Sequence, residues 1–153
     1  KKSIFWNDDI EFALAAVYKT INYIGIATDF DVELLPMYYD ESDYEFVKRL
    51  VRHAIMDRDK NQEMIKAFIK KWDIERLAVM DMLIMSMAIT EIRDFESIPV
   101  KVSLNEYIEM AKYYGSPKST TFINGVLDKI VAYMRKEGMF EKQGRGLIGN
   151  APR

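Results

Sequence analysis

The chain has 153 residues, of which 49% are hydrophobic and 30% are charged, and its formal net charge is -2. This composition fits one folded domain with a sizeable core, and it excludes both a disordered chain and a protein that coats nucleic acid through an overall basic field. With no cysteine and a single histidine, the sequence also excludes disulfides, zinc fingers, thiol catalysis and a histidine-rich metal site.

The first predicted helix extends from Ile10 to Gly25, because apolar residues recur there at steps of three and four. Three residues that favour a helix start stand directly before it, namely Asn7, Asp8 and Asp9. Residues 26–41 are less regular but contain many apolar side chains, and Pro36 discourages a continuous helix. We therefore expect a packed connection in that stretch.

Three further helices are predicted in the middle of the chain. One begins near Ser42 or Asp43 and carries an apolar stripe to Ile55. The next is predicted from a cap at Asp59 to Trp72. The third covers Ile74–Phe95 and is apolar on most sides, which is typical of a central, buried helix.

Several residues of this central region have a structural and a functional interpretation. The four methionines of the central helix could form an adaptable binding face, but core filling is favoured: Met80, Met82, Met85 and Met87. Asp81 and Glu91 interrupt the apolar pattern without sharing one face, so structural hydrogen bonding is favoured over acid chemistry. His53 lies off the apolar stripe of its helix and is expected to be a solvated surface residue.

The last third of the chain predicts a turn at 97–99 and two more helices. Ser103 and Glu106 match a capping box at the start of the first of these, and Gly115 is expected to end it. Residues 116–119 form a short loop, and the last helix then continues to Gly138.

The predicted fold is therefore all-α, a compact bundle of about six helices that occupies residues 1–137. Residues 138–153 contain little apolar surface and are expected to form a flexible tail. No segment is predicted to span a membrane, because the apolar stretch Leu77–Ile92 is short and interrupted by polar residues. The chain begins with Lys1 and not with Met, which is compatible with its being the C-terminal part of a longer chain.

Residues 113–122 combine aromatic rings, hydroxyls, one lysine and a predicted helix start. Proteins that bind single-stranded RNA need such parts, because rings stack on unpaired bases and hydroxyl or amide donors bind phosphates. A tight interhelical turn flanked by core aromatics would have the same composition. From the residues alone, that structural interpretation is favoured.

Two blocks of the sequence resemble the NusB family. Residues 100–114, VKVSLNEYIEMAKYY, are similar to a family helix in which hydrophobic positions surround the pair N-E, then a second E, then the pair A-K. Residues 119–128, STTFINGVLD, are similar to the family's closing helix, S-x-x-F-(V/I)-N-G-V-L-D. Ile74–Leu77, Asp81 and Glu91 stand where the family has its central helix. The resemblance is strong from Ile74 to Arg135 and extends back to Asp43.

This resemblance implies a NusB-like helical fold and a cytoplasmic RNA-binding factor of transcription antitermination, without catalytic activity or cofactor. The implied partners are boxA-like single-stranded RNA, the ribosomal protein NusE and the transcription elongation complex. The family's RNA surface aligns with six residues, which we take as the candidate RNA-binding site: Tyr114, Ser116, Lys118, Ser119, Thr121 and Phe122. Asn124 and Gly125 also match the family and are interpreted as packing residues.

Two departures from the family pattern leave an alternative open. The first helix starts with acidic residues where members usually carry arginines, and the central helix has Met82 and Ser86 where members often have basic residues. Either an arginine-rich helix lies upstream of Lys1, or the chain is a protein-interaction module of the same fold that has lost RNA binding. The basic residues left for RNA contact are Lys48, Arg49, Arg52, Arg58, Lys112 and Lys118.

Overall fold

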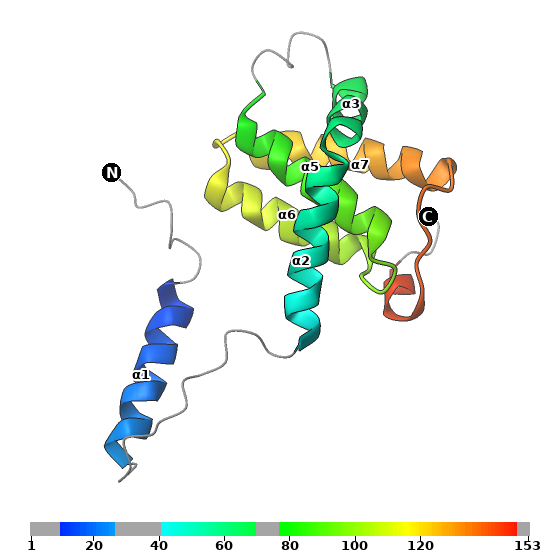
Figure 1. Ribbon diagram of the computed structural model, residues 1–153. Coiled ribbons are helices and arrows are strands. Elements are labelled where there is room, and N and C mark those ends of the chain that lie inside the picture. Colours follow the sequence, from blue (N-terminus) through cyan, green and yellow to red (C-terminus); the bar gives the residue numbers. More distant parts are fainter. Residues whose placement is uncertain (1–9, 27–40, 70–76, 150–153) are drawn as a thin grey trace. The chain divides into compact units, whose positions relative to one another are not determined.

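The computed structural model describes residues 10–26, 41–69 and 77–149, and these residues contain helices and turns but no strand (Figure 1). The helices are α1 (Ile10–Ile26), α2 (Glu41–Met56), α3 (Arg58–Phe68), α5 (Val79–Asp94), α6 (Val100–Tyr114), α7 (Ser119–Lys136) and the short 3-10 helix η1 (Gly144–Leu147). The predicted all-α class is confirmed. The chain divides into two compact units, Lys1–Glu45 and Phe46–Arg153.

Helix α1 belongs to the first unit and agrees with the predicted span within one residue at its end. Its apolar residues Leu14, Val17 and Ile21 recur at steps of three and four, which places them on one face of the helix. Glu11 in the first turn complements the positive end of the helix dipole. The predicted caps at residues 7–9 and the connection at 27–40 lie outside the described residues.

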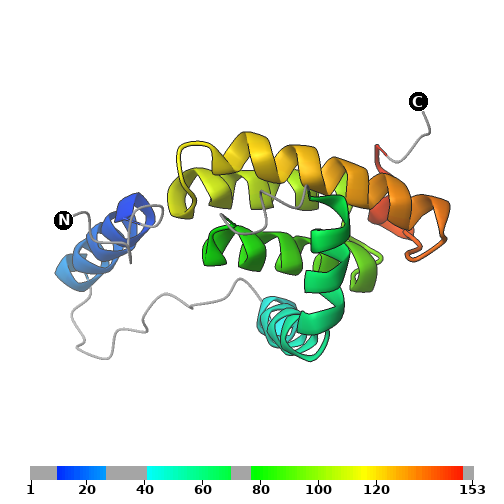
Figure 2. The same cartoon turned by 90° about the horizontal axis from the view of Figure 1, so that it is seen from above.

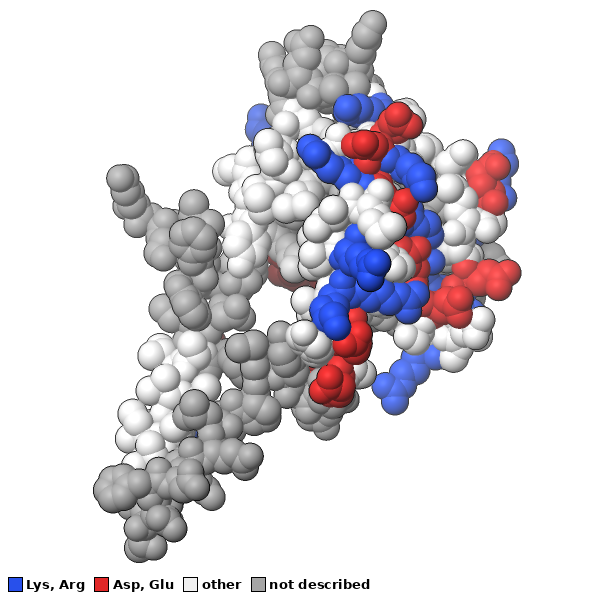
Figure 3. All heavy atoms as spheres, viewed as in Figure 1, with Lys and Arg blue, Asp and Glu red and all other residues white. Residues whose placement is uncertain are grey.

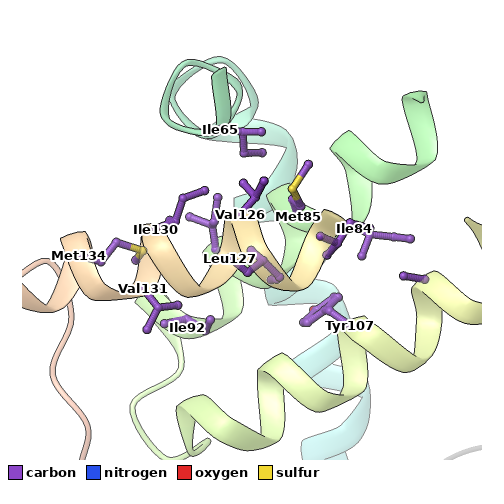
Figure 4. Packing of buried hydrophobic residues seen from close by; sticks show 14 of the residues in the cluster. Ile65, Ile84, Met85, Ile92, Tyr107, Val126, Leu127, Ile130, Val131 and Met134 are labelled. Carbon is purple, nitrogen blue, oxygen red and sulfur yellow. The ribbon is translucent and has the colours of Figure 1, made fainter. Parts of the chain in front are cut away.

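The second unit is built around α5, which packs against α3, α6 and α7. Helices α5, α6 and α7 run alongside one another, and α2 crosses them (Figures 1 and 2). Figure 4 shows apolar side chains from α3, α5, α6 and α7 meeting in one core. Among the fully buried side chains at its centre are Ile65, Met85, Ile89, Ile92, Ile123, Leu127, Ile130 and Met134.

The central helix is shorter than predicted and is not buried on all sides. It begins at Val79, because Ala78 has an extended backbone, and predicted positions 74–76 lie outside the described residues. Met85 is fully buried and Met82 and Met87 pack against the core, as expected, but Met80 is exposed. Val79 and Leu83 are also exposed, so all-round apolarity did not mean all-round burial here.

Two predicted helix caps are wrong. Asp59 lies inside α3, and the residue before that helix is Asp57, whose side chain makes no cap bond and pairs instead with Lys60 and Arg93. Ser103 lies inside α6, which starts after Pro99, and its side chain is buried. The fixed φ of Pro99 and the α5–α6 turn, not the capping box, therefore set the start of α6.

The described part of the predicted flexible tail, residues 138–149, is anchored. The Lys142 ammonium donates to the Phe95 carbonyl at 2.7 Å, and the Gln143 amide donates to the Glu96 carbonyl at 3.0 Å. A side chain at Gly146 would place Cβ 1.9 Å from the Glu96 oxygen, so glycine permits the approach of the two backbones. A flexible tail was expected because residues 138–153 contain few apolar side chains. The contacts that hold residues 138–149 are made by backbone groups and one lysine, which a count of apolar residues does not detect. The domain limit at 137 stays a prediction.

Candidate functional site

The six candidate residues gather where α6 ends and α7 begins. Tyr114 is the last residue of α6, Ser119 is the first of α7, and Gly115 to Lys118 form the turn between them. Figure 2 shows this turn at one end of the unit, beside the start of α5. The tertiary structure thus places the turn at one end of the second unit.

Gly115 makes the turn tight. An added Cβ would lie 2.6 Å from both the Ala111 carbonyl oxygen and the Ser119 Cβ. Its backbone is extended, with φ -88° and ψ 179°, so the left-handed conformation that often requires glycine is not used here. Glycine is needed because the start of α7 approaches the end of α6 too closely for a side chain.

Ser116 and Ser119 close the turn through three hydrogen bonds. The Ser116 amide donates to Ser119 Oγ at 2.7 Å, the two hydroxyl oxygens lie 2.9 Å apart, and the Ser119 amide donates to the Ser116 carbonyl at 2.9 Å. Ser119 is 1% exposed, whereas Ser116 is exposed. Ser119 was expected to contact RNA, but its buried hydroxyl serves the turn and does not reach the surface.

Lys118 in the turn and Thr121 in the first turn of α7 are also exposed to solvent. Tyr114 and Phe122 are partly buried and pack against the core beneath the turn. This packing supports a role for the two rings in shaping the turn from beneath. The outward-facing part of the candidate site is therefore Ser116, Lys118 and Thr121.

Asn124 and Gly125, predicted to be packing residues, are both exposed on α7. Among the described residues, a Cβ at Gly125 would meet no atom of another element within 4 Å, so these residues show no close helix approach that requires glycine there. The Asn124 amide reaches Asp128 on the same helix at 3.4 Å. Asn124 and Gly125 match the family motif, but both lie on the exposed face of α7, and packing does not explain why these residue types occur there.

The six basic residues named from the sequence for RNA contact do not form one face. Figure 3 shows Lys and Arg side chains over α2 and α3, interspersed with Asp and Glu. Lys112 pairs with Glu109 on α6. Lys118 is the one basic residue of the α6–α7 turn, residues 115–118. Because α2 and that turn lie apart in Figures 1 and 2, the cations split into two groups.

Charged groups concentrate where the α2–α3 corner meets the end of α5. Arg93 donates to Asp57 at 2.8 Å and to Asp94 at 2.8 and 3.1 Å. His53 Nδ1 lies 2.9 Å from Asp94 Oδ2, so His53 is a half-buried paired residue and not the solvated one that was expected. Only the fold could reveal this partner, which is 41 positions away in the chain.

These contacts shift the pKa of both carboxyls. A hydrogen bond from Lys60, supported by the charge of Arg93, lowers the pKa of Asp57 below its usual range. Burial acts to raise the pKa of Asp94, but hydrogen bonds from Arg93 and His53 outweigh it and the pKa is lowered. Both carboxylates are therefore held ionised in the folded state.

Glu91 has the structural role that was predicted for it. Its carboxylate accepts a 2.8 Å hydrogen bond from the buried Tyr107 hydroxyl, and burial with that nearby carboxylate raises the pKa of Tyr107 above its usual range. Burial lowers the pKa of Lys142, although Glu91 and Glu96 act in the opposite direction. For Asp81 the expected hydrogen bond is not found among the described residues, where the buried Oδ1 of its carboxylate has no partner.

A second surface feature is an apolar groove of about 720 Å³ between α2, α3 and α5. Its lining includes Val51, Ile55 and Leu83, and the charged residues that line it are Arg58 and Lys66. Within the described ranges, no set of three acidic or histidine side chains is placed to hold a metal ion. No described helix combines the length and apolarity needed to cross a membrane.

Sequence reasoning missed the hydroxyl pair that shapes the turn. Ser116 and Ser119 stand three positions apart at the start of a helix, and that spacing could have identified them as partners. It could not show which hydroxyl becomes buried, because that depends on how α7 packs against the core.

Comparison with known proteins identifies the family. The NusB family model matches residues 10–132. The transcription antitermination protein NusB of Salinibacter ruber is 39% identical over 140 residues, which cover 87% of each chain. The protein of the same name from Clostridium botulinum strain Kyoto is 43% identical over 89 residues, which cover 58% of this chain and 62% of that one.

A solved structure of T. maritima NusB matches with a TM-score of 0.58 and 31% identity, and the match covers 77% of this chain and 87% of that one. Its likeness extends the agreement from sequence to the arrangement of the helices. The chain belongs to the NusB family.

Proposed function

We propose that this chain is a transcription antitermination factor that binds boxA-like single-stranded RNA together with NusE in the cytoplasm, as part of the elongation complex. The observation that carries the proposal is the family match over 10–132 and the relatives named transcription antitermination protein. Its role is binding, with no reaction assigned to it.

The α6–α7 turn supports this function with suitable chemistry. Ser116 and Thr121 offer exposed hydroxyl donors, and Lys118 offers a cation for a phosphate. The turn is held by the close approach at Gly115 and by Ser119, so little ordering is required when RNA binds. Tyr114 and Phe122 are partly buried and support the turn from the core side.

The test is titration of a fluorescein-labelled boxA-like RNA with the chain, with and without NusE, measured by anisotropy against a scrambled RNA of the same composition. We expect preference for the boxA-like strand and an affinity that falls as salt rises. A Lys118→Ala, Phe122→Ala double variant should bind more weakly. Equal binding of both RNAs, or none at low salt with NusE present, would contradict the proposal.

A second candidate function is a protein-interaction module of the same fold that binds NusE without RNA. It is favoured by the net charge of -2 and by α1, whose first turn carries Glu11 and whose last turn has no basic residue. Co-elution with NusE in the absence of RNA, combined with no RNA affinity for the complex, would favour this candidate. RNA-dependent co-elution would favour the first.

A further inference from the structure

In the α6–α7 turn, the positions and the burial of the atoms determine which group donates and which accepts each hydrogen bond between Ser116 and Ser119. The Ser119 hydroxyl has two hydrogen-bond partners in the described part of the chain, and both belong to Ser116. The Ser116 amide can only donate, so Ser119 Oγ accepts from it at 2.7 Å. The open question is which of the two hydroxyls donates to the other across 2.9 Å.

Burial answers that question. Ser119 is 1% exposed, so water does not reach its hydroxyl, and a hydrogen without an acceptor there would carry the cost of a buried unsatisfied donor. The acceptor available to it is Ser116 Oγ. Ser119 therefore donates to Ser116, whose own hydroxyl hydrogen is left to point away from the turn, toward solvent.

We propose that Ser119 is a positioning residue that orients the exposed Ser116 hydroxyl as a hydrogen-bond donor toward a phosphate oxygen of bound RNA. The inference rests on the proposed function. A hydroxyl that accepts one hydrogen bond becomes a stronger donor in the next, because neighbouring bonds in a chain polarise one another. Lys118 is exposed beside Ser116 and supplies the positive charge that a phosphate requires.

A phosphate oxygen is the acceptor that fits this arrangement. The donor is a single hydroxyl fixed on a tight turn, and hydrogen bonds to ionised acceptors are about twice as strong as those to neutral ones. Phosphate contacts position a protein on its nucleic acid without reading the sequence. The Ser116 contact is thus expected to set affinity for boxA-like and scrambled strands alike, while other groups provide the preference.

A double-mutant cycle tests whether Ser119 acts through Ser116. Wild type, Ser116→Ala, Ser119→Ala and the double variant are titrated with the same boxA-like RNA in the presence of NusE. Ser116→Ala should weaken binding about tenfold, the loss expected for one charge-assisted hydrogen bond. Ser119→Ala should weaken binding by severalfold when Ser116 is present and by less than about twofold when residue 116 is alanine.

Equal losses from Ser119→Ala in both backgrounds would overturn the inference, because Ser119 would then act on the fold alone. Ser97→Ala is the matched control, since Ser97 is an exposed hydroxyl residue at the opposite end of α6 and should leave affinity unchanged. Urea unfolding of each variant separates lost stability from lost binding. Amide exchange of Ser116 in the RNA-free protein should be slow in wild type and fast in Ser119→Ala.

RNA carrying one neutral methylphosphonate linkage at a time supplies a test that does not depend on the folding of Ser119→Ala. At one linkage, the substitution should weaken wild type clearly more than Ser116→Ala, which keeps only the Lys118 charge for that phosphate. If wild type binds but every linkage affects both proteins equally, the inference is wrong and the proposed function stands. If wild type shows no affinity for any RNA, the proposed function fails and takes this inference with it.

Discussion

Two turns of the second unit are held in place by different physical means. At the α2–α3 corner, Arg93 at the end of α5 forms ion pairs with both Asp57 and Asp94. At the α6–α7 turn, Gly115 allows close contact and the hydroxyls of Ser116 and Ser119 bind each other. The first turn uses ionised groups, whereas the second uses neutral ones and the absence of a side chain.

This difference determines how each turn responds to its surroundings. Ion pairs depend on protonation, and near the surface they also weaken with salt. Hydroxyl pairs and steric fit depend on neither, so the α6–α7 turn keeps its shape when the ionic strength changes. A turn of this kind is a suitable support for a surface that binds RNA phosphates, because salt then weakens the contact with RNA and does not change the turn itself.

Gly115→Ala is expected to have the largest effect on this comparison. The new Cβ would lie 2.6 Å from the Ala111 oxygen and from the Ser119 Cβ, and both belong to helices that the core holds. Overpacking of this kind costs about 2–3 kcal/mol of unfolding free energy. Urea denaturation followed by circular dichroism measures it, and wild-type stability in this variant would show that the turn adjusts without cost.

Arg93→Ala should have the next largest effect, because it leaves two carboxylates of the α2–α3 corner without their shared cation. Its guanidinium also donates to Asn61 at 3.3 Å. Losing hydrogen bonds to charged groups costs about 2 kcal/mol here. Arg93→Lys should lose less stability than Arg93→Ala, because the ammonium keeps a positive charge near the carboxylates. It should still be less stable than wild type, because one ammonium cannot reach all of the partners of the guanidinium. Lys136→Ala, an exposed control on α7, should be neutral.

Acid should affect the two turns unequally, with a smaller loss than Arg93→Ala causes. The pKa values of Asp57 and Asp94 are lowered in the folded state, so their stabilisation is present above the unfolded pKa. It is lost as pH falls through the lower folded pKa values, that is, below about pH 4. Asp94→Asn should flatten this decline in urea titrations across pH 2–6. An unchanged slope would show that Asp94 is not coupled to folding.

Protection of individual amides extends the same measurement to the two turns. Between pH 5 and pH 3, the Asn61 amide, which donates to the Asp57 carbonyl at 2.9 Å, should lose protection earlier than the Ser119 amide. Simultaneous loss at both turns would mean that the unit opens only as a whole.

Gly125→Ala should have the smallest effect and the opposite sign to Gly115→Ala. The site is exposed in the middle of α7, and a Cβ there would meet no atom of another described element within 4 Å. Alanine is favoured over glycine in a helix interior by up to about 1 kcal/mol, so unfolding should require more urea. A destabilised Gly125→Ala variant would contradict the open surroundings described for this position.

The helices were largely predictable from the sequence, whereas the candidate site was predictable only in outline. The 3.6-residue periodicity placed α2, α6 and α7 within a few residues, because an amphipathic helix must bury its apolar stripe. The predicted site lies on one turn, as the family resemblance implied. Which of its hydroxyls is exposed was not predictable, since Ser116 and Ser119 look alike in one dimension.

The sequence by itself determined the helical class and the family, because periodicity and motif spacing are properties of neighbours along the chain. Only the tertiary structure decided that Gly125 is open, that Ser119 is buried and that His53 pairs with Asp94. Each of these depends on contacts between residues of different helices or on which face of a helix the core covers. Such contacts are fixed by packing in three dimensions, which local patterns do not encode.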